Sequence, residues 1–463
     1  MPEAYDLLIA GGGPAGLAAA AEAAAAGLAV GLVDERVTLG GQIFKQLGPG
    51  FEGELDPRGR RLIDAAERSS ARIMCSTAVV AIEGDEVVLV AEGERARTVR
   101  ARRLLLATGA YDRPVAFDGW TLPGVLTAGG AQTLVKTQRV VPGRHVVFAG
   151  SGPLALVFPA QLRSLGVDVE LVLEAGPPPR PGDVARMLRA ARGNGVLLRQ
   201  AIEARLALRR TPLRYRRIVV RAEGAGRVES VTHARVDADW RAVEGSEETV
   251  AADALCVGYG FTPSVELARL AGCRCAYDED RGGPIVMVDD WMRTSVDGVF
   301  AAGDGTGVDG SYVAIEEGRL AALGAARDLG VAVNEAAAEP IRARIAAKRR
   351  FARALRRMHR IGPGIDELAS SETVVCRCEE VTLRELDAAI ETTADASVVK
   401  ALTRAGMGLC QGRNCQRSVA ARIAARHGLA IGAVEPPTPR LPARPVPLGA
   451  IAHASEDDPG LFQ

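Results

Sequence analysis

The fold is decided by Asp6-Leu-Leu-Ile-Ala10, then Gly11-Gly-Gly-Pro-Ala-Gly16, then an alanine-rich segment to Gly27, and finally Leu28-Ala-Val-Gly-Leu-Val33. Two apolar runs of strand length flank a segment long enough for a helix, and the glycines supply the turn between the first run and that helix. This order predicts a strand, a glycine turn, a helix and a second strand. A βαβ unit of this kind indicates an α/β protein with a parallel sheet.

The same pattern returns in the middle of the chain. Arg144-His-Val-Val-Phe-Ala149 is followed by Gly150-Ser-Gly-Pro-Leu-Ala155, a predicted helix to Gly166, and the apolar run Val167 to Leu173. We therefore predict two Rossmann-like dinucleotide-binding domains. A late apolar run, Gly298 to Gly303, is expected to return the chain to the first of them.

The length and net charge of the chain limit the number of domains and the kinds of function to be considered. Its 463 residues suggest about three domains at roughly 150 residues each. The 57 basic residues balance the 57 acidic ones, so no overall charge draws the chain to nucleic acid. The apolar run Pro14 to Val33 has no basic residue before it and is broken by glycines, so we expect neither a signal peptide nor a transmembrane segment, and a cytoplasmic location.

The first glycine turn has the chemistry of a dinucleotide site. Gly11 permits a tight turn and Gly13 lets the backbone approach a pyrophosphate. Gly16 allows the helix to pack close to the strand, and Pro14 and Ala15 lie between them at the helix start, whose free amides attract anions. The second strand ends 23 to 24 residues after Gly11 at two acids that can accept hydrogen bonds from ribose hydroxyls. These acids are Asp34 and Glu35, and we prefer Asp34 as the acceptor for the ribose.

The second glycine turn leaves its ligand open. Gly150, Gly152 and the acid Glu174 at the end of the following strand would suit NADH better than NADPH, because no arginine cluster awaits a 2′-phosphate. Pro159 within the predicted helix argues against a working site. A NADH site, a site for another nucleotide and a domain kept only for its structure all remain open.

Four cysteines near the C-terminus predict a metal site. Cys376, Cys378, Cys410 and Cys415 form two close pairs, and four thiolates are the ligand count of an iron–sulfur cluster. We predict a [2Fe–2S] cluster, with zinc as the alternative, although zinc sites use wider spacings than the single residue between the first two cysteines. The other four cysteines are scattered and are expected to be buried or incidental thiols.

Three segments complete the organisation. Residues 214–237 alternate apolar and polar side chains and predict a hairpin that turns at 223–226. Residues 340–360 hold nine Lys or Arg and no acid, and predict a basic amphipathic helix. It either packs one face on the core as a connector or docks to an acidic partner. Residues 436–463 are proline-rich and are expected to be extended.

The domain ranges follow from these features. We expect a dinucleotide-binding domain in two pieces, 1–115 and 285–335, which the resemblance described next makes an FAD-binding domain; a second nucleotide-binding-like domain, 116–284; a basic helical linker, 336–371; a small helical [2Fe–2S] domain, 372–432; and a proline-rich tail, 433–463.

Three further motifs resemble the flavoprotein superfamily that includes glutathione and thioredoxin reductases. They are Gly40-Gly41-Gln42, Ala107-Thr108-Gly109, and Thr294-x6-Ala301-Ala-Gly303-Asp304. The resemblance implies a glutathione-reductase-like fold and bound FAD, with Asp304 accepting hydrogen bonds from the ribityl and pyrophosphate portion. Disulfide reduction is unexpected, because Gly40 to Gln46 lacks the cysteine pair that such reductases need.

The cysteine segments resemble another family. Cys376-Arg-Cys-Glu-Glu-Val-Thr382 and Gly406-Met-Gly-Leu-Cys-Gln-Gly-Arg-Asn-Cys415 are similar to the bacterioferritin-associated-ferredoxin type of [2Fe–2S] domain. Their four-residue second gap resembles the version in large subunits of bacterial amino-acid dehydrogenases. We expect Thr382 to cap one helix and Cys415 to open another, with helix-end amides offsetting the cluster's negative charge.

As a whole the chain resembles the α subunits of octopine, nopaline, D-hydroxyproline and L-proline dehydrogenase complexes and the corresponding subunit of hydrogen cyanide synthase. The resemblance implies a β subunit similar to D-amino-acid oxidase that carries the substrate site. In some members it also implies FMN at a subunit interface and a small ferredoxin-like γ subunit.

We expect an FAD-dependent oxidoreductase, the electron-transferring subunit of a complex that oxidises a C–N bond in an amino acid, imino acid or opine. No catalytic residue is identified. One alternative is a stand-alone NADH-dependent flavin and iron–sulfur reductase, and another is a redox-sensing module without turnover.

Overall fold

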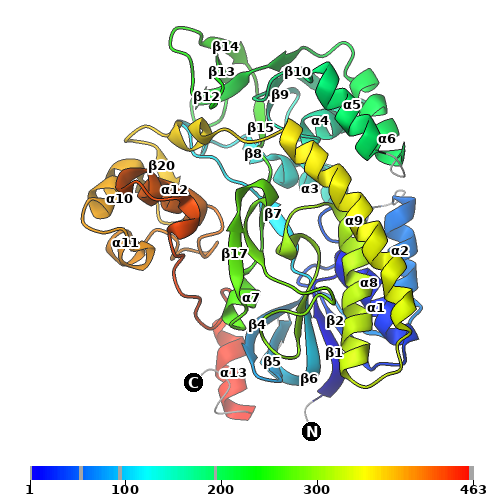
Figure 1. Ribbon diagram of the computed structural model, residues 1–463. Helices are drawn as coiled ribbons and strands as arrows, with labels where there is room; N and C mark the ends of the chain where they lie inside the picture. Colours follow the sequence, from blue (N-terminus) through cyan, green and yellow to red (C-terminus); the bar gives the residue numbers. More distant parts are fainter. Residues whose placement is uncertain (1–2, 49, 52–55, 92–95, 192–194, 458–463) are drawn as a thin grey trace. The chain divides into compact units, whose positions relative to one another are not determined.

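The computed structural model describes residues 3–48, 50–51, 56–91, 96–191 and 195–457 (Figure 1). The chain divides into two compact units, each assembled from separate stretches. Unit 1 comprises Met1–Ala110, Thr262–Ala352 and Pro439–Gln463, and unit 2 comprises Tyr111–Phe261 and Arg353–Thr438. Each unit is described by itself.

Unit 1 is built on a seven-stranded sheet in the order β3-β2-β1-β6-β5-β4, with β19 paired to β6. Strands β3, β2, β1, β6 and β19 run parallel, whereas β4, β5 and β6 form an antiparallel meander. The strands are β1 (Glu3–Ala10), β2 (Val30–Val33), β3 (Arg72–Met74), β4 (Thr77–Glu83), β5 (Glu86–Ala91), β6 (Ala96–Leu106) and β19 (Val299–Ala301).

Helices cover one face of the parallel part of this sheet (Figure 1). Strand residues such as Leu7, Ile9 and Leu105 are fully buried, and they share one core with Leu17 of α1 and Phe300 of β19. Because α1 is composed largely of alanine, α8 can pack closely beside it. The helices of unit 1 are α1 (Pro14–Ala25), α2 (Pro57–Glu67), α7 (Glu266–Leu270), α8 (Ser311–Asp328), α13 (Leu448–Asp457) and most of α9 (Glu335–Met358).

Unit 2 contains a second parallel sheet, of five strands in the order β11-β10-β9-β15-β8. Its strands are β8 (Val125–Thr127), β9 (His145–Gly150), β10 (Asp168–Glu174), β11 (Leu213–Tyr215) and β15 (Ala254–Gly258), and its helices include α3 (Ala128–Gln138), α4 (Leu154–Ser164), α5 (Pro181–Ala190) and α6 (Gly195–Ala207). The two predicted Rossmann-like folds are therefore confirmed.

The predicted hairpin is present in unit 2. Strands β12 (Arg217–Glu223) and β13 (Ser230–Arg235) pair antiparallel, and β14 (Glu248–Ala251), which the sequence did not indicate, adds a third strand.

The cysteine-bearing segment folds as the small, mainly helical part expected. A short strand pair, β20 (Val374–Cys376) and β21 (Val381–Thr382), precedes α10 (Leu383–Ile390), α11 (Ala396–Thr403) and α12 (Gln416–His427). A local core that includes Leu386, Val399 and Ile423 holds them together. Thr382 caps α10 through a reciprocal capping box with Glu385, and Cys415 is the N-cap of α12, as predicted.

The expectation of an extended tail was wrong for its last part, because residues 448–457 form α13. This segment follows Pro447 and contains three alanines and one leucine, which favour helix, so the prolines before it do not prevent the helix.

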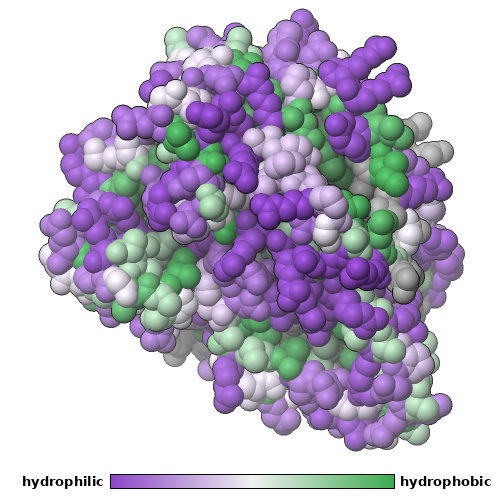
Figure 2. Space-filling model, turned by 45° about the horizontal axis from the view of Figure 1, so that its top comes forward, coloured by the Kyte–Doolittle hydropathy of each residue, from purple (hydrophilic) through white to green (hydrophobic). Residues whose placement is uncertain are grey.

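Among the described residues, none of the helices combines the length and hydrophobicity that crossing a membrane requires. On the face shown in Figure 2, hydrophilic residues surround separate groups of hydrophobic ones.

Candidate functional site

The first glycine turn forms an open cradle at the start of α1. Gly11 has a φ of +115°, and a Cβ there would lie 2.3 Å from the carbonyl oxygen of Ala107, so only glycine fits. A Cβ on Gly13 would meet only the Cα of Gly41, at 3.8 Å, which leaves that side of the loop uncovered. Gly13 is the N-cap of α1 and Pro14 follows at the first helical position, so free helix amides face this opening. The cradle fits a pyrophosphate group.

Asp34 lies directly after β2 and is buried. Its carboxylate accepts hydrogen bonds from the amides of Gly12, at 2.6 Å, and Arg36, at 2.8 Å. Burial raises the pKa of Asp34, and those two amides oppose the shift. Glu35 is half exposed and pairs with Arg444 of the C-terminal segment. Of the two predicted acids, Asp34 is the one held against the glycine turn.

Two of the family motifs border the same loop. Gly40 donates its amide to the carbonyl of Gly12 at 2.9 Å, and a Cβ on Gly41 would lie 2.8 Å from the Cα of Gly13, whereas the side chain of Gln42 is exposed. The structure thus brings Gly41, and through it the loop that carries Gln42, against the cradle.

The Ala107-Thr108-Gly109 turn follows β6 directly. The amide of Ala107 donates to the carbonyl of Ala10 at 2.8 Å, and the hydroxyl of Thr108 donates to the carbonyl of Ser264 at 2.6 Å. Gly109 has a φ of +71° and no atom within 4 Å of a Cβ built on it. Ala107 and Thr108 therefore lie beside the end of β1, where the cradle begins.

Gly303 and Asp304 follow β19 and reach the cradle from the other side. A Cβ on Gly303 would lie 3.1 Å from the Cβ of Ala15. Burial, together with the nearby carboxylates of Glu317 and Asp309, raises the pKa of Asp304 to about 6, while the amides of Gly310 and Asp309 oppose the shift. An ionised carboxylate here can accept hydrogen bonds from sugar-like hydroxyls.

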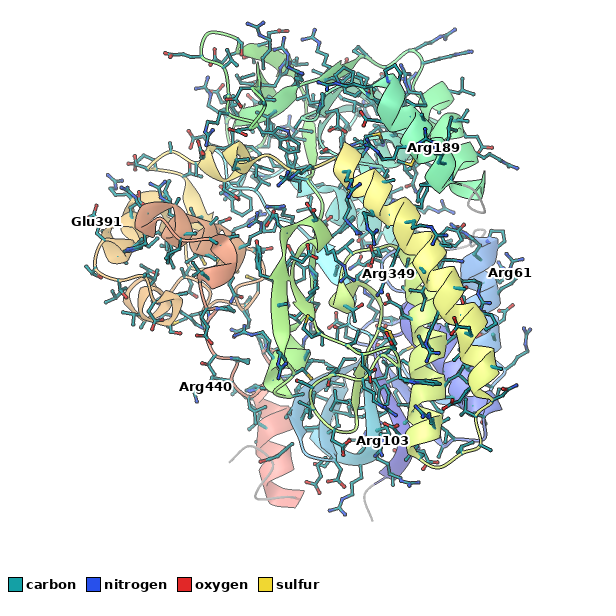
Figure 3. The ribbon with its side chains drawn as sticks, viewed as in Figure 1. Arg61, Arg103, Arg189, Arg349, Glu391 and Arg440 are labelled. Atoms are coloured by element: carbon teal, nitrogen blue, oxygen red, sulfur yellow. The ribbon has the colours of Figure 1, made fainter. Side chains whose placement is uncertain are left out.

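A buried group of charges behind Gly303 was missed by the sequence analysis. Glu317 of α8 accepts from the amide of Gly303 at 2.8 Å and from the hydroxyl of Thr306 at 3.1 Å. It also pairs with Arg349 of α9 at 2.7 Å, and Figure 3 shows Arg349 on that helix. The available signal was the pair Glu316-Glu317, two acids inside a helix that is otherwise largely small and apolar.

In the second fold, the carboxylate of Glu174 has hydrogen-bond partners within the chain. It is buried at the end of β10 and accepts from the amides of Gly152, at 3.1 Å, and Gly176, at 2.9 Å. His359, just after α9, places its Nδ1 3.5 Å from the same carboxylate. The glycine turn of Gly150 and Gly152 is therefore intact, but a histidine of the chain lies at the acid that would receive a ribose.

The side chains of the four cysteines lie close to one another. The thiols of Cys376 and Cys415 are hydrogen-bonded, as are those of Cys378 and Cys410, and Cys415 interacts electrostatically with all three others. Cys376 and Cys415 are buried, Cys410 is half-buried and Cys378 is exposed.

The backbone around the cysteines suits an anionic cluster. The thiol of Cys415 and the amides of Gly406, Glu379 and Cys378 lower the pKa of Cys376 to about 5, so this sulfur is readily a thiolate. Amides directed at sulfur are the donors that iron–sulfur clusters use to offset their charge. The residues present therefore fit a cluster held by four cysteine thiolates.

Trp120 anchors this domain within unit 2. Its indole nitrogen donates to the carbonyl of Val374 at 2.6 Å, two residues before the first cysteine. Asp118 accepts from the hydroxyl of Ser370 at 2.7 Å and also from Thr373. The segment before β8 thus fixes the start of the cysteine domain.

A Rossmann-like fold with a glycine cradle, joined to a four-cysteine domain, defines an oxidoreductase that binds FAD and a [2Fe–2S] cluster. A family model described as pyridine nucleotide-disulphide oxidoreductase matches residues 5–321, and one described as BFD-like [2Fe-2S] binding domain matches residues 374–425. The chain belongs to the pyridine nucleotide-disulphide oxidoreductase family. Within it, the chain belongs with a group of enzyme subunits that match it over nearly its whole length.

One of these relatives is a subunit of the opine oxidase of Agrobacterium tumefaciens, which is 34% identical over 476 residues that cover 97% of this chain and 92% of that protein. Hydrogen cyanide synthase subunit HcnB of Pseudomonas protegens is 34% identical over 468 residues, 97% of this chain and 98% of that protein. The fold matches the crystal structure of L-proline dehydrogenase from P. horikoshii with a TM-score of 0.70, at 23% identity, over 97% of this chain and 80% of that one.

Proposed function

We propose that this chain is the electron-transferring α subunit of a multi-subunit dehydrogenase that oxidises the C–N bond of an amino acid, an imino acid or an opine. The observation that carries the proposal is its similarity, over nearly the full length, to subunits of opine oxidase and hydrogen cyanide synthase. Such an oxidation removes two electrons and two protons from an amine and leaves an imine, which water then hydrolyses.

The candidate site residues in the described part of the chain are those that would hold cofactors. Bound FAD takes up two electrons together and releases them singly, and a [2Fe–2S] centre carries one at a time. In the proposal, the amides at the start of α1 hold the pyrophosphate, Asp34 and Asp304 accept from the sugar hydroxyls, and Cys376, Cys378, Cys410 and Cys415 ligate the iron.

The positions of the histidines agree with substrate chemistry on another chain. The four whose side chains the structure describes lie in unit 2, and each is either buried or in contact with another group of that unit. His145 pairs with Glu170, His359 contacts Glu174, His427 contacts the carbonyl of Ile390, and His233 is fully buried. We therefore propose that the substrate site is carried by a β subunit similar to D-amino-acid oxidase. FMN at the interface and a ferredoxin-like γ subunit remain predictions of the resemblance.

The test is anaerobic mixing of the chain, alone and co-purified with its β subunit, with octopine, nopaline, proline derivatives and glycine. Only the complex should bleach its flavins, with one of these substrates, and then give the electron paramagnetic resonance signal of a reduced [2Fe–2S] cluster. Bleaching of the isolated chain by NADH within milliseconds would instead favour the stand-alone reductase.

The variant Cys410→Ser tests whether the cluster and the flavin site are separate. It should abolish the visible absorbance of the cluster and leave FAD bound, because the cluster ligands and the glycine cradle belong to different units. Flavin reduction in the complex should persist while transfer to a one-electron acceptor is lost. Loss of both chromophores would show that the two sites are not separable.

A further inference from the structure

The C-terminal segment packs on unit 1, far in sequence from the strands that it contacts. The amide of Ala443 donates to the carbonyl of Val80 in β4 at 2.7 Å. Val446 and Ala450 then pack against Val80, Val88 and other buried residues of the β4, β5 and β6 meander. Figure 1 shows α13 beside this meander. The segment is therefore held by a hydrogen bond and by an apolar contact.

Between those two attachments, Arg444 reaches the acids at the end of β2. Its guanidinium pairs with Glu35, and its side chain is only 33% exposed. It also interacts electrostatically with Asp34, whose carboxylate is held by the amide of Gly12. Arg440, which lies four residues earlier in the sequence and is labelled in Figure 3, is exposed. Arg444 is therefore directed toward the predicted ribose acid.

The strand that carries Val80 begins at that same acid loop. The amide of Thr77 donates to the carbonyl of Asp34 at 2.9 Å, and the amide of Ser76 donates to the carbonyl of Arg36 at 2.8 Å. The C-terminal segment thus crosses β4 three residues beyond the loop where the adenosine ribose is expected. It is well placed to border the adenosine end of the dinucleotide.

We propose that residues 439–451 form a clasp over the adenosine end of bound FAD, with Arg444 as the positioning residue that fixes the clasp to Asp34 and Glu35. This inference depends on the assignment of the glycine cradle and Asp34 to FAD, and it does not depend on the proposed electron relay.

Two physical points support the clasp. Asp34 accepts hydrogen bonds from ribose hydroxyls best when ionised, and burial raises its pKa, whereas the positive charges of Arg36 and Arg444 oppose that shift. The segment from Pro436 to Pro447 also contains six prolines, which restrict the free chain and so reduce the entropy lost when it is ordered.

The experiment compares release of FAD from full-length Arg444→Gln, Arg440→Gln and the unchanged chain, followed by the recovery of free-flavin fluorescence after dilution. Arg444→Gln should release FAD roughly tenfold faster, the factor that corresponds to one lost charged hydrogen bond, and Arg440→Gln should behave as the unchanged chain. A chain ended after Thr438 should lose FAD at least as fast as Arg444→Gln. Adding FAD to the flavin-free chain should slow amide hydrogen exchange across residues 441–451.

The variant Asp34→Asn distinguishes the assignment of Asp34 to FAD from the proposal of the clasp. Fast release from Asp34→Asn, with wild-type release from both Arg444→Gln and the shortened chain and no protection of residues 441–451, overturns the clasp and keeps the flavin site. Wild-type release from Asp34→Asn overturns the flavin assignment itself, and the clasp with it.

Discussion

Asp304, the acid proposed to accept hydrogen bonds from FAD, is expected to lower the stability of the FAD-free chain when it is ionised. Its pKa is raised to about 6 by burial and by the neighbouring carboxylates of Glu317 and Asp309. An acid whose pKa is higher in the folded chain than in the unfolded chain favours folding while it is protonated. Its ionisation therefore removes stability as the pH rises from about 4 to about 6.

Asp304→Asn should remove this pH-dependent loss. We expect the free energy of unfolding of the FAD-free variant to exceed that of the unchanged chain by about 2 kcal/mol at pH 7.5, and by much less at pH 4.5. Urea denaturation at the two pH values measures the difference. The same variant should bind FAD more weakly, because an amide accepts fewer hydrogen bonds than a carboxylate. An equal stability difference at both pH values would contradict the assignment of the loss to Asp304.

At the level of elements, α9 shows where the sequence could and could not predict the structure. The run of basic residues predicted a helix, and the helix is present as Glu335–Met358. The sequence left open whether its charges meet the core or an acidic partner. Arg344 and Lys348 pair with Glu316, and Arg349 pairs with Glu317, so these charges are used within the chain. Their acids lie about thirty residues earlier on another helix, and periodicity within one helix carries no information about that contact.

The cap of α10 could be predicted because it depends only on residues close together in the sequence. Thr382 and Glu385 lie three residues apart, and their reciprocal hydrogen bonds need only the local backbone. The glycine cradle was also predicted from local sequence, by the glycine spacing together with the strands and the helix around it. The contacts of Glu317, His359 and Arg444 each join distant segments, so a local pattern could not reveal them.

Arg349→Ala tests the link between α8 and α9. It leaves Glu317 buried without its cation, and removing one partner of a buried pair costs about 3 kcal/mol. We expect a loss of that order in the free energy of unfolding, measured by chemical denaturation. Arg350→Ala is the matched control, because Arg350 is exposed on the same helix and its loss should change stability by less than about 0.5 kcal/mol. Equal effects of the two variants would show that the buried pair does not stabilise the link.

At the level of the whole molecule, the two nucleotide folds differ in which residue contacts the acid at the end of the second strand. In unit 1, Asp34 and Glu35 meet the C-terminal segment through Arg444. In unit 2, Glu174 meets His359 from the segment after α9. In both folds, therefore, the backbone of a nucleotide site is kept and a side chain from a later segment of the chain contacts the acid that would face a ribose.

NADH should bind the isolated chain weakly and reduce its flavin slowly. We expect no bleaching within seconds at about 1 mM NADH, the upper end of common KM values, when the chain is mixed anaerobically without partners. His359→Ala frees Glu174 and should tighten NADH binding, measured by the fluorescence of the reduced nicotinamide. If the unchanged chain already binds NADH tightly, the contact between His359 and Glu174 does not limit access.

The interleaving of the two units has a consequence for biosynthesis. Strand β19 pairs with β6 across nearly two hundred intervening residues, and the segment that carries Arg444 joins the same unit later still. While the chain is still being translated, the unit with the glycine cradle lacks a strand, the acid Asp304 and its last covering segment. Stable insertion of flavin should therefore follow synthesis of that segment, and a shortage of FAD in the cell would leave the segment incompletely ordered.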